Sequence, residues 1–226
     1  MPFMSSRRRV VAVLAVLATM GTLSAAVSAS ADSGGAGDNS DHGDGISVNA
    51  RKTTGRASVT GSATFVLPYH PDADVRSFTF DAHADPYSSP LPGIPTGLPT
   101  DARGTVKVSH YSADRNVTYT AEGHVDCLVT GPHTATLTAV ITKVSPGGPP
   151  WMGERLGFSV YDGGADKGHY RDRVGFSWEM VNLLPGGTGA PSEAEVGTCM
   201  APAPYAPVVK GGYTVRHADL PPAPQR

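Results

Sequence analysis

The 226-residue sequence has a modest share of charged residues, only two cysteines and no long apolar run. Charged side chains make up 17%, and no cluster of Lys and Arg occurs after residue 31. Nucleic acids and anionic membranes attract proteins through such clusters, so the composition disfavours both as partners. No apolar segment reaches the ~20 residues that a transmembrane helix needs, so we expect no membrane-spanning segment.

The sequence also lacks the short motifs that mark many enzymes. It contains no G-x-S-x-G nucleophile motif and no Gly-rich phosphate loop between a strand and a helix. Two serines in apolar runs, Ser159 and Ser177, are predicted to point outward from strands because apolar residues occupy the alternate positions. These absences favour a non-enzymatic role over catalysis.

The first 31 residues have the three parts of an export signal. Arg7, Arg8 and Arg9 precede an apolar run over 10–23, and small residues at 29–31 supply a cleavage site before Asp32. The same basic stretch also fits a twin-arginine signal, which leaves the export route open. Cleavage would remove three arginines and leave 15 basic and 20 acidic residues. We therefore expect a secreted, mildly acidic protein.

The remaining chain divides by composition into three parts. Residues 32–56 are rich in Gly, Ser and Asp and poor in large apolar residues, so we expect a disordered spacer. Residues 57–220 are predicted to form a single domain, and 221–226 to form a tail.

Alternation of apolar and polar residues predicts an all-β fold. Every second residue over 117–129 is apolar or small, and a second alternating run over 135–141 follows a turn at Gly131-Pro132. We expect further strands in six segments: 57–67, 75–82, 104–111, 156–160, 174–178 and 208–215. Together they predict a single antiparallel β-sandwich or barrel of about eight strands with long Gly/Pro loops.

The two cysteines are candidates for a disulfide. Export leads to an oxidising compartment, where an even cysteine count favours pairing of Cys127 with Cys199. The alternation also places Cys127 on the inner face of its strand, where it could serve as a small buried apolar residue instead.

Two histidines stand between acidic residues on predicted outer faces. His83 and His124 each have an acidic residue two positions before and after them. Ligands at this spacing can meet one ion, so a metal-binding module or metal-dependent hydrolase is the alternative function. The same letters also occur on the solvated face of an antiparallel sheet.

A Gly-rich loop offers three carboxylates, Asp162, Asp166 and Asp172. Oxygen ligands in a flexible loop suit calcium, although the spacing departs from the twelve-residue calcium loop. The alternative is that Asp and Gly provide the turn chemistry of a hairpin. We expect no cofactor other than weakly bound calcium.

One set of residues resembles a known group of proteins. It comprises the run from Gly123 to Gly131 (GHVDCLVTG), Ala135, the run 157–164 and Asp172–Val174. These resemble a small secreted bacterial β-domain, whose actinobacterial members sometimes carry the label repetin. The resemblance covers about residues 75–218 and implies export and an all-β fold. It implies no catalytic residue, and carries over only Cys127 and Asp162 as pattern positions.

We therefore expect an exported β-domain with a binding or structural role at the cell envelope or in the medium. Its partner would be a macromolecule or envelope component contacted by the outer sheet face or by the Pro-rich loop 86–102. A protease inhibitor that presents the same loop is a further alternative.

Overall fold

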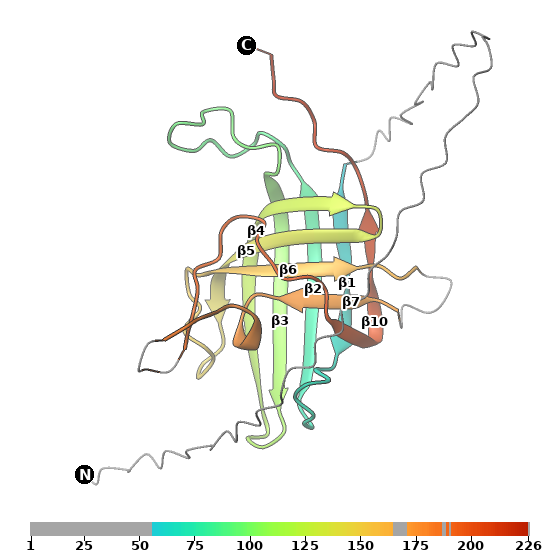
Figure 1. Cartoon of the computed structure of the whole chain (residues 1–226), viewed down its shortest axis with the longest axis vertical. Helices are drawn as coiled ribbons and strands as arrows, with labels where there is room; N and C mark the ends of the chain where they lie inside the picture. The colour runs from blue at the N-terminus through green and yellow to red at the C-terminus, as the bar shows by residue number, and fades with distance from the viewer. Residues whose placement is uncertain (1–55, 165–170, 187–188, 190, 226) are drawn as a thin grey trace, which may run out of the picture. The chain divides into compact units, whose positions relative to one another are not determined.

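The computed structural model describes residues 56–164, 171–186, 189 and 191–225, which form an antiparallel β-barrel (Figure 1). Its eight strands close in the order β1-β10-β7-β6-β5-β4-β3-β2. They are β1 (Ser58–Phe65), β2 (Val75–Ala84), β3 (Ala102–Ser112), β4 (Val117–Gly131), β5 (Thr134–Val144), β6 (Arg155–Tyr161), β7 (Arg173–Phe176) and β10 (Ala206–Arg216). The all-β prediction is confirmed, and closure decides for a barrel rather than a sandwich.

The connection from β7 to β10 carries the remaining elements. It contains a 3-10 turn (Glu179–Val181) and the two-stranded pair β8 (Leu183–Leu184) and β9 (Ser192–Glu193). In the described ranges, no helix is long and apolar enough to cross a membrane. The predicted signal peptide lies outside the described residues, as does the spacer except for Arg56, which pairs with Asp85 (3.0 Å).

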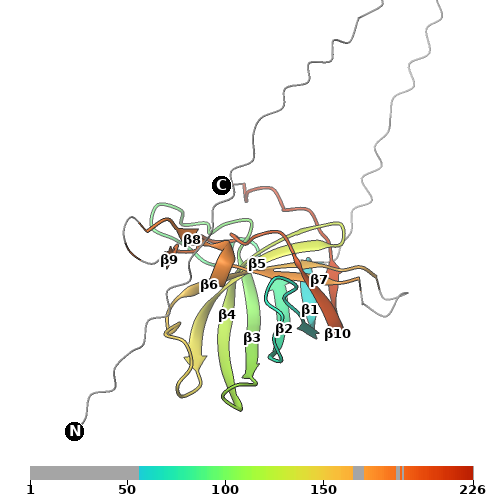
Figure 2. The same ribbon diagram turned by 60° about the horizontal axis from the view of Figure 1, so that its bottom comes forward.

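Alternation along the strands fills the barrel with one core. Phe78 and Phe80 of β2 point inward, and their rings meet that of Phe158 from β6 at 5.3 and 5.4 Å between centroids. Tyr213 of β10 closes the cluster beside Phe80. Burying each large apolar side chain contributes about 1.5–3 kcal/mol, so this aromatic centre holds the wall strands together. Figure 2 shows β2, β3 and β4 side by side along one wall.

A bulge in β4 reverses the alternation near the cysteine. The register with β5 shifts between Val125 and Cys127, so that Leu128 pairs with Leu137 and enters the core. Cys127 instead pairs with Thr138 on the outer side of the sheet. The expectation that Cys127 lies on the inner face of its strand is therefore wrong, because a bulge inserts one residue and inverts the side chains beyond it.

A strap over 199–205 covers this outer face. Cys127 and Cys199 are bonded, with 5.3 Å between their Cα atoms, as the cysteine count predicted. A Cβ on Gly157 would lie 1.9 Å from the Met200 carbonyl oxygen, and one on Gly175 would lie 2.6 Å from that of Ala203. Glycine at both positions lets the strap approach β6 and β7 closely, so Ser159 is buried rather than solvent-facing.

Two carboxylates complete the closure between β10 and β7. These strands pair only at Ala206–Val174 and Pro207–Arg173. Farther along β10, Asp172 accepts a hydrogen bond from the Tyr213 amide, and Asp162 accepts one from the Val215 amide. The carboxylates thus take the place of a neighbouring strand for buried backbone donors that would otherwise lack a partner.

Candidate binding pocket at one end of the barrel

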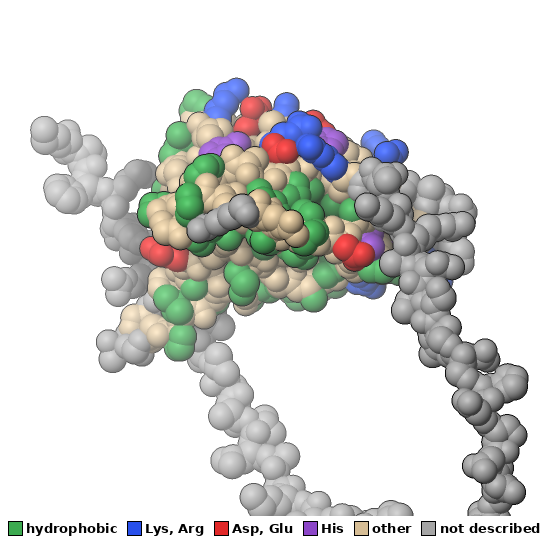
Figure 3. Space-filling view, turned by 90° about the horizontal axis from the view of Figure 1, so that it is seen from above, with side chains coloured by type: hydrophobic (Ala, Val, Ile, Leu, Met, Phe, Trp, Pro, Cys, Tyr) green, Lys and Arg blue, Asp and Glu red, His purple; other side chains and the backbone are tan. Residues whose placement is uncertain are grey.

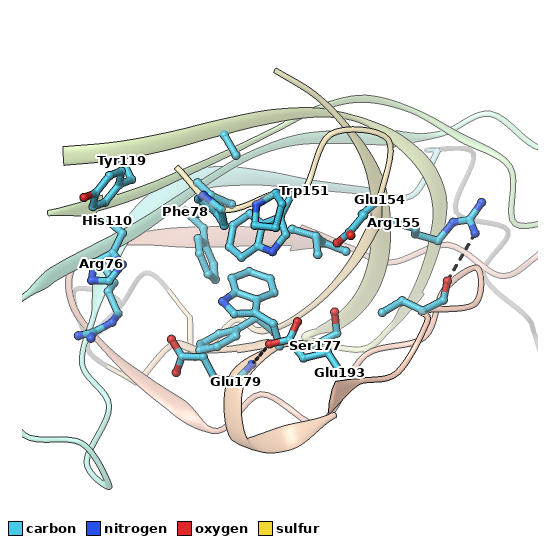
Figure 4. Close-up of a pocket in the computed structure, with 18 of the residues that line it drawn as sticks. Arg76, Phe78, His110, Tyr119, Trp151, Glu154, Arg155, Ser177, Glu179 and Glu193 are labelled. Atoms are coloured by element: carbon cyan, nitrogen blue, oxygen red, sulfur yellow. Dashed lines mark hydrogen bonds between the residues drawn. The ribbon is translucent and has the colours of Figure 1, made fainter. Parts of the chain in front are cut away.

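A pocket of about 860 Å³ opens where β2 and β4 begin and β3 ends. Its walls come from these strands, from the β5–β6 loop and from the connection that follows β7 (Figure 4). Six of the residues that line it are Arg76, His110, Trp151, Trp178, Glu179 and Glu193. The volume falls within the range typical of small-molecule sites, about 300–1,000 Å³.

Aromatic rings form the inner part of the pocket. Trp178 follows β7, is 7% exposed and packs on Phe176 and Phe78 at centroid distances of 4.4 and 5.6 Å. Trp151, from the β5–β6 loop, packs against Trp178 with 5.1 Å between ring centroids and is only partly buried. The pocket therefore offers flat apolar surface on which a ligand ring can stack.

A charged residue points into the barrel beside these rings. Arg76 has the same inward parity on β2 as Phe78, and is 8% exposed. Its Nη1 and Nη2 donate to Asp72 at 2.9 and 2.6 Å, which lowers the Asp72 pKa to about 2. Its Nε is buried and has no hydrogen-bond partner. Burial of this guanidinium is tolerated because the fork is paired with a carboxylate.

His110 lies on the neighbouring strand and is bound to a second carboxylate. Its Nε2 is 2.7 Å from Asp74 Oδ2. The Ala113 amide and this histidine both lower the pKa of Asp74, the amide more strongly. His110 and Arg76 are thus both matched with acids of the β1–β2 loop.

Glu179 sits at the pocket wall in an unusual backbone conformation. Its φ is +62°, a left-handed geometry that costs a non-Gly residue on the order of 1–2 kcal/mol. Its backbone amide donates to Glu193 Oε1 at 2.9 Å, the dashed line in Figure 4, so the Glu193 side chain is held against the backbone of Glu179. Burial raises the pKa of the Glu179 carboxyl, against the opposing positive charge of Arg76. The fold thus maintains a strained and partly desolvated carboxylate at this site.

The pocket lining carries more unpaired acid than base. Arg155 is bonded to Asp126 at 2.7 Å, and Arg76 is bonded to Asp72. Four glutamates also line the pocket, and no ion pair between described residues includes any of them: Glu154, Glu179, Glu193 and Glu195. Since both arginines are paired with aspartates, the glutamates leave the pocket lining with an excess of negative formal charge.

The metal-site candidates are not brought together by the fold. His83 lies on β2, hydrogen-bonded to Asp81, and His124 lies on β4, with β3 between the two strands. Asp162 and Asp172 bind backbone amides of β10, and Asp166 lies outside the described residues. Within the described part of the chain, no three His, Cys, Asp or Glu side chains form a group that could hold a metal ion.

The sequence carried a signal for one pocket residue and none for the others. Arg76 shares the parity of Phe78 and Phe80, so an inward charge was visible in the alternation of 75–82. Trp151, Glu179 and Glu193 lie on connections, where no periodicity predicts which way a side chain points.

No family model, curated protein or solved structure matches the chain.

Proposed function

We propose that this chain is an exported, non-enzymatic binding protein that holds a small ligand with a flat apolar part in the open end of its barrel. The observation that carries the proposal is the pocket of about 860 Å³ lined by Trp151 and Trp178. An eight-stranded barrel has an interior just wide enough for side chains or for one small ligand.

The polar groups in the pocket support binding rather than catalysis. The Ser177 hydroxyl accepts a hydrogen bond from the Gly157 amide, and His110 is bound to Asp74. Among the described lining residues, no hydroxyl is hydrogen-bonded to a histidine, as a nucleophile and its base would be. Arg76 Nε is a buried donor that a polar ligand atom could satisfy.

Export is the second part of the proposal. The predicted signal peptide over 1–31 and the Cys127–Cys199 bond both fit an oxidising compartment outside the cytoplasm. The ligand would come from the medium or the cell envelope. Intact-mass analysis of protein from the culture medium should give a chain beginning at Asp32. Retention of the intact 226-residue chain inside the cell would contradict this part.

A bulky side chain placed inside the pocket should prevent the protein from binding its ligand. Ala121 lines the pocket from β4, so Ala121→Phe should abolish the fluorescence rise of a neutral apolar dye such as Nile red. Thr118→Phe adds a ring on the exposed side of the same strand and is the matched control. Circular dichroism of both variants checks that each is folded. Equal dye binding by the wild type and Ala121→Phe would overturn the pocket as the binding site.

A further inference from the structure

We propose that the ligand is an organic cation, with an ammonium group beside Glu179 and Glu193 and a flat apolar body against Trp151 and Trp178. This inference rests on the proposed binding function and specifies the chemical class that the pocket selects. It follows from three features of the described pocket: its charge, its aromatic walls and the backbone at Glu179.

The charge of the pocket favours a cation over an anion. Both arginines that line it already form short pairs, Arg76 with Asp72 and Arg155 with Asp126. Neither Glu179 nor Glu193 forms an ion pair with a described residue, although Arg76 acts on Glu179 electrostatically from a greater distance. The Glu179 amide also holds the Glu193 side chain close to the backbone of Glu179. The negative charge of Glu193 opposes ionisation of Glu179, and a cation bound in the pocket would offset that repulsion.

The aromatic walls add to the same preference. Trp178 forms the inner surface and Trp151 the outer one, with 5.1 Å between their centroids. Indole faces attract ammonium groups through their negative quadrupole, and the attraction grows when the site is shielded from water. Glu179 directly follows Trp178 in the chain, so carboxylate and indole come from adjacent residues.

The backbone conformation of Glu179 favours a binding role for its carboxylate. Glycine or asparagine would occupy a φ of +62° with less strain. Glutamate at this position is neither the most stable choice for the turn nor engaged in an ion pair with any described residue. Strained residues persist where the surrounding structure and function require them. Ligand binding is a role that the Glu179 side chain can fill.

The test compares three probes of similar size on the mature protein. Benzyltrimethylammonium carries the charge, neopentylbenzene is its neutral carbon isostere and phenylacetate is anionic. Binding is followed by quenching of the Trp151 and Trp178 fluorescence. We expect at least tenfold tighter binding of the cation than of either other probe. Glu179→Gln and Glu193→Gln should each weaken cation binding by about three- to tenfold and leave the neutral probe unchanged.

Glu122→Gln is the matched control, because Glu122 lies on the outer face of β4 near Lys107 and Lys143, outside the pocket. It should leave all three affinities unchanged. Equal or tighter binding of the neutral or anionic probe would overturn the inference while the proposed binding function stands. Failure of all three probes and of the neutral dye would overturn both.

Discussion

The Asp172 carboxylate accepts a hydrogen bond from the Tyr213 amide at 2.8 Å, and it does so where β7 and β10 no longer pair. The other oxygen of the same carboxylate accepts from the Gly163 amide at 2.8 Å. Asp172 is 0% exposed, so water cannot replace it. One side chain therefore joins the β6–β7 loop to β10 and completes the barrel wall.

Replacing this carboxylate should destabilise the protein strongly. Asp172→Asn keeps one acceptor but presents an NH₂ group to a backbone donor, which should lower the free energy of unfolding by about 2–3 kcal/mol. Urea denaturation measures the loss. Asp81→Asn, at an exposed site on β2, should change stability by no more than about 0.5 kcal/mol. Similar effects for the two substitutions would contradict the role assigned to Asp172.

The disulfide should contribute a large part of the stability. It joins positions 72 residues apart, and closing such a loop in the unfolded chain is worth about 4 kcal/mol in the chain-entropy model. The double substitution Cys127→Ala, Cys199→Ala should therefore lower the unfolding free energy by roughly that amount. Hydrogen exchange should rise over 199–205, where the strap loses its tether. Two free thiols in unfolded, unreduced wild-type protein would rule the bond out.

Gly157 should tolerate no side chain, because the Met200 carbonyl oxygen occupies the space of its Cβ. Gly157→Ala must displace the strap, at about 2–3 kcal/mol by the usual cost of overpacking. Gly189→Ala is the control, since no atom lies within 4 Å of a Cβ there. Thermal unfolding of both variants tests the difference. An unchanged melting temperature for Gly157→Ala would show that the strap does not rest on β6.

Glu179 should make stability depend on pH. Burial raises its folded-state pKa above the usual 4.5, so the charged form opposes folding at pH values above that raised pKa. Glu179→Gln should then be more stable than wild type at pH 7. The gain should disappear as the pH falls below 4.5, where the wild-type carboxyl is protonated in both states.

Melting temperatures of the wild type and Glu179→Gln between pH 4 and pH 8 measure this dependence. Glu122→Gln should show no such gain, because Glu122 lies near two lysines on the exposed face. A Glu179→Gln gain that is independent of pH would show that the gain does not come from removing a buried charge.

The strand pattern was predictable because alternation reports burial directly. The hairpin over 117–142 and six further strand segments were found from alternate apolar positions, and the structure places strands in each. The inversion at Cys127 was not predictable, since a bulge changes the register through pairing with β5 and leaves no distinct mark in β4 itself. The face on which Leu128 lies was therefore decided by the neighbouring strand.

Asp162 and Asp172 also separate what the sequence predicts from what only the fold decides. Asp162 and Asp172 were recognisable as carboxylates around glycines, and their spacing suited either a turn or a calcium loop. Only barrel closure brings Asp172 to the amide of Tyr213, 41 residues along the chain, and Asp162 to the amide of Val215, 53 residues along the chain. The small charged surface visible in Figure 3, where basic and acidic side chains lie close together, likewise reflects packing rather than any charge run in the sequence.

By itself, the sequence determined the all-β class, the strand positions, the cysteine pair and the expectation of export, because each depends on local composition or on a period of two. The tertiary structure decided the closed barrel, the strap held on β6 and β7 by glycine, and the pocket. Arg76, Trp151 and Glu179 come from segments as much as 103 residues apart. Their meeting depends on long-range strand pairing and loop packing, which no local pattern encodes.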